Sequence, residues 1–227
     1  MARFSRMKVL NAIYETSLVP VFYHADLETA IKVVSAVSRG GCRLLEYVNR
    51  GDHAFEVFSS LETHFRKENP EIILGAGSIV DPYTAALYIN AGANFIVGPT
   101  LNADVAKLCN RRKIAYSPGC GSASEISRAE ELGCEICKIF PGKEVGGPGF
   151  ASSLLGPMPW SSLMPTGGVE PTPESIGQWV SAGVAAIGMG SKLITAKAVK
   201  DGDWKRIEDN VRNALKIIEE AKKKMKG

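Results

Sequence analysis

A lysine in the middle of an apolar segment is the first residue of this sequence that points to chemistry. Lys138 lies within Glu135–Phe140, a run that we predict to form a β-strand, where alternation places it on one face with Ile136 and Phe140. Burial disfavours the charged ammonium, and a neutral amine is the form that attacks a ketone to give a Schiff base. The alternatives are a lysine that extends to solvent or one that binds substrate by charge alone. Two rival lysines lie in loop or helix-start positions where a solvated charge is expected, Lys143 and Lys192.

A carboxylate shows the same pattern with the opposite charge. Glu46 lies on the inward face of the apolar run Arg43–Val48. A buried carboxylate either has a cationic partner or takes up a proton, so a general acid/base and an ion pair to a lysine or arginine are both consistent with the sequence. The two roles can coexist, because Glu46 and Lys138 should point into the same space. Arg50, in the following turn, could hold a substrate carboxylate through paired hydrogen bonds or be an exposed loop arginine.

Two glycine-rich turns, Thr166-Gly167-Gly168 and Gly188-Met189-Gly190-Ser191, are typical of anion binding. Bare backbone N–H groups beside a helix start suit a phosphate; tight turns without a ligand are the alternative. The histidines are less informative, since His24 ends a predicted strand and could touch substrate or be a satisfied rim histidine, while His53 and His64 fall on a surface helix. No set of His, Asp and Glu has metal-ligand spacing, so we expect metal-free chemistry.

Short apolar runs alternate with amphipathic segments along the chain, which predicts repeated strand–helix units. Successive runs begin roughly 20–30 residues apart, about the length of one βα unit. Cap residues mark helix starts, as in Asp81-Pro82 and Thr172-Pro173, and glycines such as Gly92 and Gly133 mark helix ends. The predicted strands are Leu18–Tyr23, Arg43–Val48, Ile72–Gly75, Phe95–Gly98, Ala115–Ser117, Glu135–Phe140, Leu163–Thr166 and Ala185–Met189.

Eight such units favour a closed barrel over an open parallel sheet, and no GxGxxG follows the first run to indicate a dinucleotide fold. We therefore predict an α/β fold, a (β/α)8 TIM barrel with an extra N-terminal helix near residues 5–16, as a single domain over residues 1–227. In such barrels the functional groups lie at the carboxyl ends of the strands. A long closing helix is indicated by an apolar stripe, Ile207, Val211, Leu215 and Ile218.

Composition excludes several function classes. Of 227 residues, 45% are hydrophobic and 22% charged, values typical of a folded globular protein. A net charge of +3 is too small to indicate nucleic-acid binding. The sequence has no run of about 18 apolar residues, so we expect no membrane span. Residues 1–6 lead into a mixed helix instead of the apolar core of a signal peptide. The five cysteines are expected to be reduced thiols in a cytoplasmic protein, with Cys134 and Cys137 on opposite sides of one strand, unsuited to redox or zinc chemistry.

Several motifs follow one another in a specific order over about residues 15–205: Gly40-Gly41 before Glu46, Gly75-Ala76-Gly77, Pro118-Gly119, Lys138-Ile139-Phe140-Pro141, Pro165-Thr166-Gly167-Gly168 and Gly190-Ser191. This ordered set resembles the bacterial 2-keto-3-deoxy-6-phosphogluconate (KDPG) aldolases, which also act as 4-hydroxy-2-oxoglutarate aldolases. The resemblance implies a class I aldolase that needs no cofactor, forms a homotrimer, and cleaves a phosphorylated keto acid to pyruvate and glyceraldehyde 3-phosphate.

The resemblance also implies roles for individual residues. Lys138 would form the Schiff base, Glu46 would transfer protons through a bound water, and Arg50 with Ser78 would hold the pyruvate carboxylate. Pro99 and Phe140 are expected to line the site. The residues expected to hold the phosphate are Thr166, Gly167, Gly168, Gly190 and Ser191.

Three departures from the family pattern leave substrate preference open. Ser78 stands where better-known members have threonine, the segment Glu46–Asp52 differs around the same Glu and Arg, and Phe22-Tyr23-His24 lacks an arginine found in some relatives. We expect KDPG first, a phosphorylated epimer such as the galactonate compound close behind, and hydroxyoxoglutarate well below both. The alternatives from other classes are an isomerase, epimerase or decarboxylase on the same phosphate-binding barrel, and a non-catalytic phosphate-binding barrel.

Overall fold

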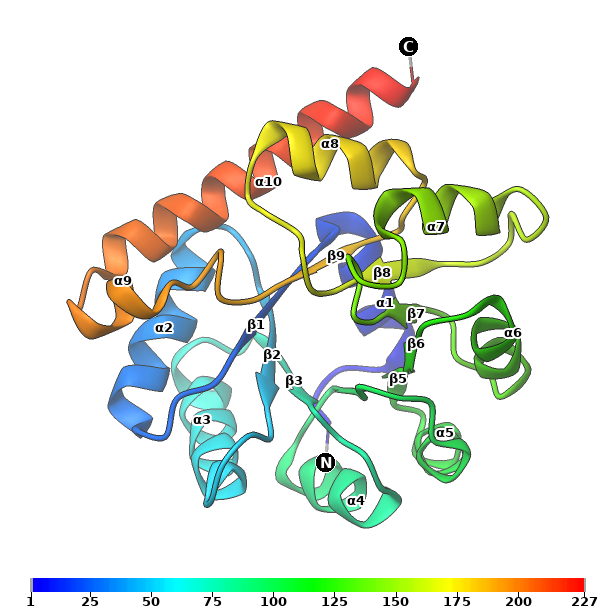
Figure 1. Ribbon diagram of the computed structural model, residues 1–227. Coiled ribbons are helices and arrows are strands. Elements are labelled where there is room, and N and C mark those ends of the chain that lie inside the picture. Colours follow the sequence, from blue (N-terminus) through cyan, green and yellow to red (C-terminus); the bar gives the residue numbers. More distant parts are fainter. Residues whose placement is uncertain (1, 227) are drawn as a thin grey trace.

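The computed structural model describes residues 2–226 and arranges them as a ring of parallel strands surrounded by helices (Figure 1). The strands are β1 Leu18–Phe22, β2 Leu44–Val48, β3 Ile73–Gly77, β4 Phe95–Val97, β5 Ala115–Ser117, β6 Gly119–Cys120, β7 Cys137–Ile139, β8 Leu163–Pro165 and β9 Ile187–Met189. The helices are α1 Arg6–Thr16, α2 Leu27–Arg39, α3 Ala54–Glu68, α4 Pro82–Ala91, α5 Ala103–Arg112, α6 Ala123–Glu131, α7 Gly147–Leu155, α8 Pro173–Ser181, α9 Ala196–Lys200 and α10 Trp204–Lys226.

The ring consists of two parallel ladders that meet at two seams. One ladder has the order β5-β4-β3-β2-β1-β9 and the other β6-β7-β8. At one seam a backbone bridge joins Thr166, directly after β8, to Gly188 of β9. At the other, β5 and β6 are separated only by Pro118, which has no N–H to donate to a ladder. If β5 and β6 are counted as one interrupted strand, the ring of the described residues has eight strands, and the predicted (β/α)8 fold is confirmed.

The strand that carries Lys138 is shorter than predicted. The strand expected over Glu135–Phe140 is only Cys137–Ile139, because its partners β6 and β8 are themselves two and three residues long. Cys134 therefore lies before the strand and not within it, which corrects the expectation that both thiols of the pair share a strand. All five cysteines are free and buried, and burial raises the pKa of the Cys134 thiol to about 12.

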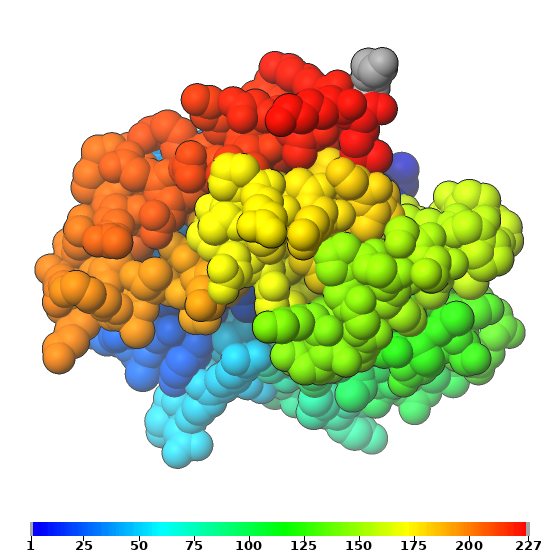
Figure 2. Space-filling view, turned by 45° about the horizontal axis from the view of Figure 1, so that its top comes forward, coloured from blue at the N-terminus to red at the C-terminus, as the bar shows by residue number. Residues whose placement is uncertain are grey.

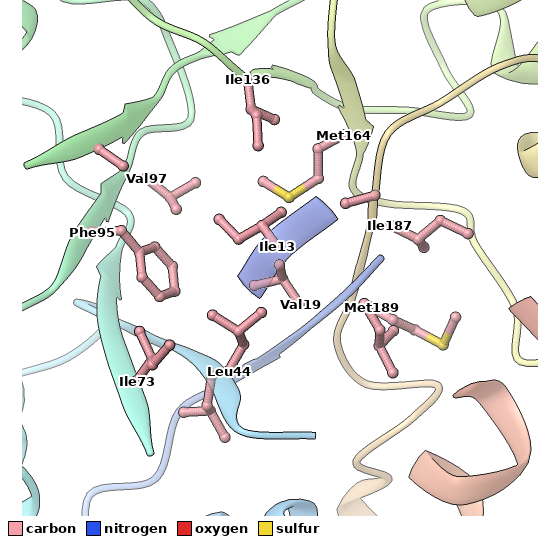
Figure 3. Packing of buried hydrophobic residues seen from close by; sticks show 14 of the residues in the cluster. Ile13, Val19, Leu44, Ile73, Phe95, Val97, Ile136, Met164, Ile187 and Met189 are labelled. Carbon is pink, nitrogen blue, oxygen red and sulfur yellow. The ribbon is translucent and has the colours of Figure 1, made fainter. Parts of the chain in front are cut away.

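The N-terminal helix closes the amino-terminal end of the barrel, as predicted. Ser5 caps α1, and its side chain accepts a hydrogen bond from the Lys8 backbone N–H. Figure 3 shows Ile13 of α1 among the interior side chains Val19, Leu44 and Met164. This end of the barrel is therefore filled with packed apolar side chains, and the opposite end remains for a binding site.

Helix starts also follow the expected capping pattern. The Asp81 carboxylate accepts hydrogen bonds from the backbone N–H groups of Tyr83 at 2.9 Å and Thr84 at 2.8 Å, and the Thr172 hydroxyl accepts one from Ser175 at 3.2 Å. Each cap satisfies backbone donors that the first helical turn leaves unpaired. Both caps begin helices that directly follow site-forming loops.

The C-terminal helix packs along the outside of the ring. Ile207, Val211 and Ile218 of α10 are buried, and α10 contacts α2 and α8. Figure 2 shows this helix in red across the surface above α8 in yellow. Among the described residues, no helix combines the length and the apolar character needed to cross a bilayer.

Candidate active site

The predicted lysine and glutamate meet inside the barrel. The Lys138 ammonium nitrogen lies 3.6 Å from Glu46 Oε1, and the two side chains are 6% and 1% exposed. This separation exceeds the 2.7–3.2 Å typical of an N–H···O hydrogen bond. Neither Glu46 oxygen has a hydrogen-bond partner among the described residues. A buried carboxylate beside a buried amine, with lone pairs left unused, is an arrangement suited to accepting and returning protons.

Glycines of β3 make the space for the glutamate. Glu46 is paired in register with Gly75, and a Cβ placed on Gly77 would overlap the Glu46 carboxylate. A Cβ on Gly75 would overlap the ring of Phe95. The motif Gly75-Ala76-Gly77 therefore has a steric reason that sequence reasoning did not identify: any side chain at position 77 would displace Glu46.

The lysine is fixed by its strand and by an aromatic ring. Its backbone N–H donates to Pro118 O at 2.9 Å, and its register partners are Gly119 and Met164. The Lys138 nitrogen lies 5.0 Å from the centroid of the Phe140 ring, which confirms that these two residues share a face. A ring at this distance attracts the ammonium form and forms an apolar wall for the neutral amine.

A cavity of about 950 Å³ opens at the carboxyl ends of the strands. Lys138 and Glu46 are not among its lining residues, but the Phe140 ring, which the Lys138 nitrogen approaches, belongs to that lining. The pair is therefore buried behind the cavity wall. The ionisable groups among its described lining residues are Tyr23 and four basic side chains, with no carboxylate: His24, Arg50, Lys192 and Lys200. Such a lining favours an anionic ligand.

Arg50 lies in a well-ordered turn after β2. Its Nε donates to the Ser78 hydroxyl at 3.1 Å. The preceding residue, Asn49, is held by its backbone N–H, which donates to Gly77 O at 2.8 Å, and by the Tyr88 hydroxyl, which donates to Asn49 Oδ1 at 3.0 Å. Ser78 has a left-handed φ of 58°. Arg50 and Ser78 are therefore brought together as predicted, although Ser78 itself is outside the cavity lining.

The two glycine turns form one corner of the cavity. Thr166, Gly167, Gly168, Gly190 and Ser191 all belong to its lining. Among the described residues, the backbone N–H groups of Gly168 and Ser191 have no acceptor, and the buried Thr166 hydroxyl has no partner. A Cβ on Gly188 would overlap that Thr166 hydroxyl. Unpaired donors at one corner are what an anion site requires.

Pro99 and Lys143 are not among the residues that line the cavity. Pro99 follows β4, and its carbonyl packs so closely on Gly119 that a Cβ there would overlap it. Lys143 is exposed, and exposed Lys192 lies 3.4 Å from Glu170 at the rim. Within the part of the chain that the structure describes, no three His, Cys, Asp or Glu side chains are grouped as metal ligands would be.

Residues of two helices also line the cavity, and the sequence did not predict them. Lys200 of α9 and Thr29 of α2 line the cavity. Both lie well beyond the strand ends, where periodicity gives no sign of a site. A basic residue at the end of a short helix following a phosphate-type turn was the available signal.

The chain is similar to one family of known proteins over most of its length. The family model for KDPG and KHG aldolase matches residues 9–210. A 2-dehydro-3-deoxy-phosphogluconate aldolase from Pseudoalteromonas atlantica is 32% identical over 198 residues, covering 87% of this chain and 89% of the relative. The KHG/KDPG aldolase of Escherichia coli is also 32% identical, covering 87% and 90%.

A solved structure has the same fold, at a lower sequence identity than these two relatives. It is the KDPG aldolase from Legionella pneumophila with pyruvate captured as a covalent carbinolamine intermediate, which is 25% identical with a TM-score of 0.81, covering 90% of this chain and 97% of that one. The family model's match over residues 9–210 includes β1 to β9 and both glycine turns. By sequence and by structure, the chain belongs to the KDPG and KHG aldolase family.

Proposed function

We propose that this protein is a class I aldolase that cleaves KDPG to pyruvate and glyceraldehyde 3-phosphate, with 4-hydroxy-2-oxoglutarate as a slower substrate. The observation that carries the proposal is the buried Lys138–Glu46 pair, 3.6 Å apart beneath a cavity with a basic lining. The names of the relatives indicate the same chemistry. The proposal includes the site residues as assigned by the family resemblance.

The reaction begins when Lys138 transfers a proton to Glu46 and its neutral amine adds to the C2 ketone. Glu46 returns this proton to the carbinolamine hydroxyl, which leaves as water to give an iminium. Glu46, as carboxylate, then removes the proton of the C4 hydroxyl through a water molecule, the C3–C4 bond breaks, and its electron pair forms an enamine as the aldehyde leaves. Protonation at C3 and addition of water to the iminium release pyruvate and restore the amine.

The charges of the cavity match those of the substrate. Arg50 with Ser78 would hold the C1 carboxylate through charge-assisted hydrogen bonds. The backbone N–H groups of Gly168 and Ser191 and the Thr166 hydroxyl would hold the phosphate. Around the ring, β7 with Lys138 lies between β3, which precedes the Ser78 turn, and β8, which precedes the Gly167-Gly168 turn. An acid held at both turns would present its ketone near the lysine.

Incubation with pyruvate and borohydride tests the proposal. Reduction of a Schiff base gives a permanent increase in mass, which peptide mapping should locate on Lys138. An isomerase, an epimerase or a non-catalytic barrel would gain no such mass. Trapped pyruvate on Lys143 or Lys192 would contradict the assignment of the nucleophile.

Assembly and location complete the proposal. We propose a single-domain protein that forms a homotrimer in the cytoplasm. Support for association with further copies comes from exposed apolar side chains on and beside α4, where Val80, Tyr83 and Leu87 are 55%, 82% and 54% exposed. Support for the cytoplasm comes from five cysteines without a disulfide. Sedimentation equilibrium measures the mass of the assembly, and a monomeric mass would contradict the trimer.

A further inference from the structure

Two segments that depart from the family pattern at different places in the sequence meet in the structure. The buried Tyr47 hydroxyl donates to the His24 backbone carbonyl at 2.9 Å. The rings of Tyr23 and Tyr47 lie 5.8 Å apart between centroids. The departures after β1 and after β2 therefore form one continuous wall, in which a tyrosine of β2 fixes the backbone that carries His24.

The same wall fixes the orientation of the His24 ring. Its Nδ1 accepts a hydrogen bond from the Asp26 backbone N–H at 3.0 Å. The same nitrogen also lies 3.3 Å from the Asp26 carbonyl oxygen, a contact that would need the proton on Nδ1. The shorter contact, with the Asp26 N–H, favours the tautomer that carries the proton on Nε2, because an N–H group can only donate. Among the described residues Nε2 has no hydrogen-bond partner, while His24 lines the cavity. The turn therefore holds an N–H donor in the cavity wall.

The strand order gives the position of this donor relative to the substrate. In the ladder β3-β2-β1-β9, the end of β1 lies between the turn that carries Arg50 and the turn that carries Gly190 and Ser191. These turns are the expected sites of the carboxylate and of the phosphate. A group after β1 therefore faces the part of the substrate between its two charged ends.

We propose that His24 is a specificity-determining residue whose Nε2–H donates a hydrogen bond to the C5 hydroxyl of the substrate, next to the carbon that bears the phosphate. The inference rests on the proposed function and extends it to the substrate class: 3-deoxy-2-keto acids that carry a hydroxyl beside the terminal phosphate. In the direction of aldol addition, this hydroxyl is the C2 hydroxyl of glyceraldehyde 3-phosphate.

The test compares two acceptor aldehydes in pyruvate addition. Glyceraldehyde 3-phosphate has the hydroxyl, and 3-oxopropyl phosphate lacks it while keeping the phosphate. In His24→Ala, kcat/KM should fall about three- to tenfold for the first aldehyde, as expected for one neutral hydrogen bond, and stay unchanged for the second. An equal loss with both aldehydes, or no loss with either, would overturn the assignment.

A matched variant separates recognition from a role in the turn. His24→Asn keeps a side-chain acceptor for the Asp26 N–H, but it is too short to place a donor where Nε2 lies. We expect it to lose the preference for the hydroxylated aldehyde as fully as His24→Ala does. If His24→Asn retains the wild-type preference, the ring serves only the turn and the proposal is wrong.

A reaction confined to pyruvate separates this inference from the proposed function. Exchange of the pyruvate methyl protons with deuterated water requires the Schiff base and the enamine but no aldehyde. Wild type and both His24 variants should exchange at the same rate. Absence of exchange in wild type would refute the aldolase and this inference together, whereas normal exchange with an unaltered aldehyde preference would refute only the role of His24.

Discussion

Replacing Gly77 with alanine should disable the proposed enzyme while the barrel still folds. The three atoms nearest to a Cβ at this position all belong to Glu46, with Cδ at 2.6 Å and Cγ at 2.7 Å. Since ordinary contacts begin at 3.4 Å, the carboxylate must move by about 1 Å, a displacement that can cost about 10²-fold in rate. Gly77 does not have a left-handed φ, so its backbone accepts alanine.

The assay measures kcat for KDPG cleavage through release of pyruvate, together with thermal unfolding followed by circular dichroism. We expect kcat to fall about 10²-fold and the free energy of unfolding to fall by about 1–3 kcal/mol from overpacking. Gly177→Ala is the matched control, because nothing lies within 4 Å of a Cβ in that helix. It should keep the wild-type kcat and gain about 0.5–1 kcal/mol of stability.

A second variant keeps the test decisive if the single one unfolds. Combining Gly77→Ala with Glu46→Asp shortens the side chain that the methyl group displaces, so stability should recover while kcat stays low. A Gly77→Ala protein with wild-type kcat and KM would refute the reasoning, because Glu46 would then function equally well from a different position.

Four further predictions address the nucleophile, the proton carrier, the phosphate site and stability. Lys138→Ala and Lys138→Arg should abolish both turnover and borohydride trapping with the fold intact by circular dichroism; residual trapping would assign the amine elsewhere. Glu46→Gln should still be trapped slowly but lose about 10²–10⁴ in rate, the contribution of general acid–base catalysis, whereas unfolding without a kinetic defect would favour a purely structural ion pair. KDPG should exceed its dephosphorylated analogue in kcat/KM by about two to five orders of magnitude, since each charge-assisted hydrogen bond contributes about 1.5–3 kcal/mol; equal values would mean that the glycine turns bind no phosphate. Glu62→Ala should lower the free energy of unfolding by about 3 kcal/mol in urea titrations, and kcat should not change. The reason is that Arg3 Nε, which is 3.0 Å from Glu62 Oε1 in a largely buried pair, would lose this carboxylate partner.

Periodicity predicted the strands and their order because each apolar run must face the barrel interior. It could not give the lengths of the strands, since a ladder extends only as far as its neighbours do. For this reason β7 is shorter than its apolar run, next to the two-residue β6. The interruption at Pro118 follows from the missing N–H and could have been read from the sequence.

The meeting of Lys138 and Glu46 inside the barrel was also predictable, because a lysine and a glutamate on inward faces have few structural uses. The steric role of Gly77 was not, since it depends on which side chain of the neighbouring strand occupies that space. The contact between Tyr47 and His24 was hidden for the same reason. Alternation gives the face of a strand on which a residue lies, but it does not give the residue of the neighbouring strand that this side chain contacts.

The seam between β8 and β9 has a consequence for how a ligand and the fold affect each other. In the described chain, the seam is joined by the bridge between Thr166 and Gly188 and by the Ala185 backbone N–H, which donates to Leu163 O at 2.9 Å. A phosphate bound by Gly168 on one side and Ser191 on the other would connect the two edges across that seam. The bound phosphate would then stabilise the seam against local opening. Backbone amides of the flanking turns should therefore exchange with deuterium more slowly in its presence. Phosphate binding and closure of the ring would be thermodynamically coupled, each favouring the other.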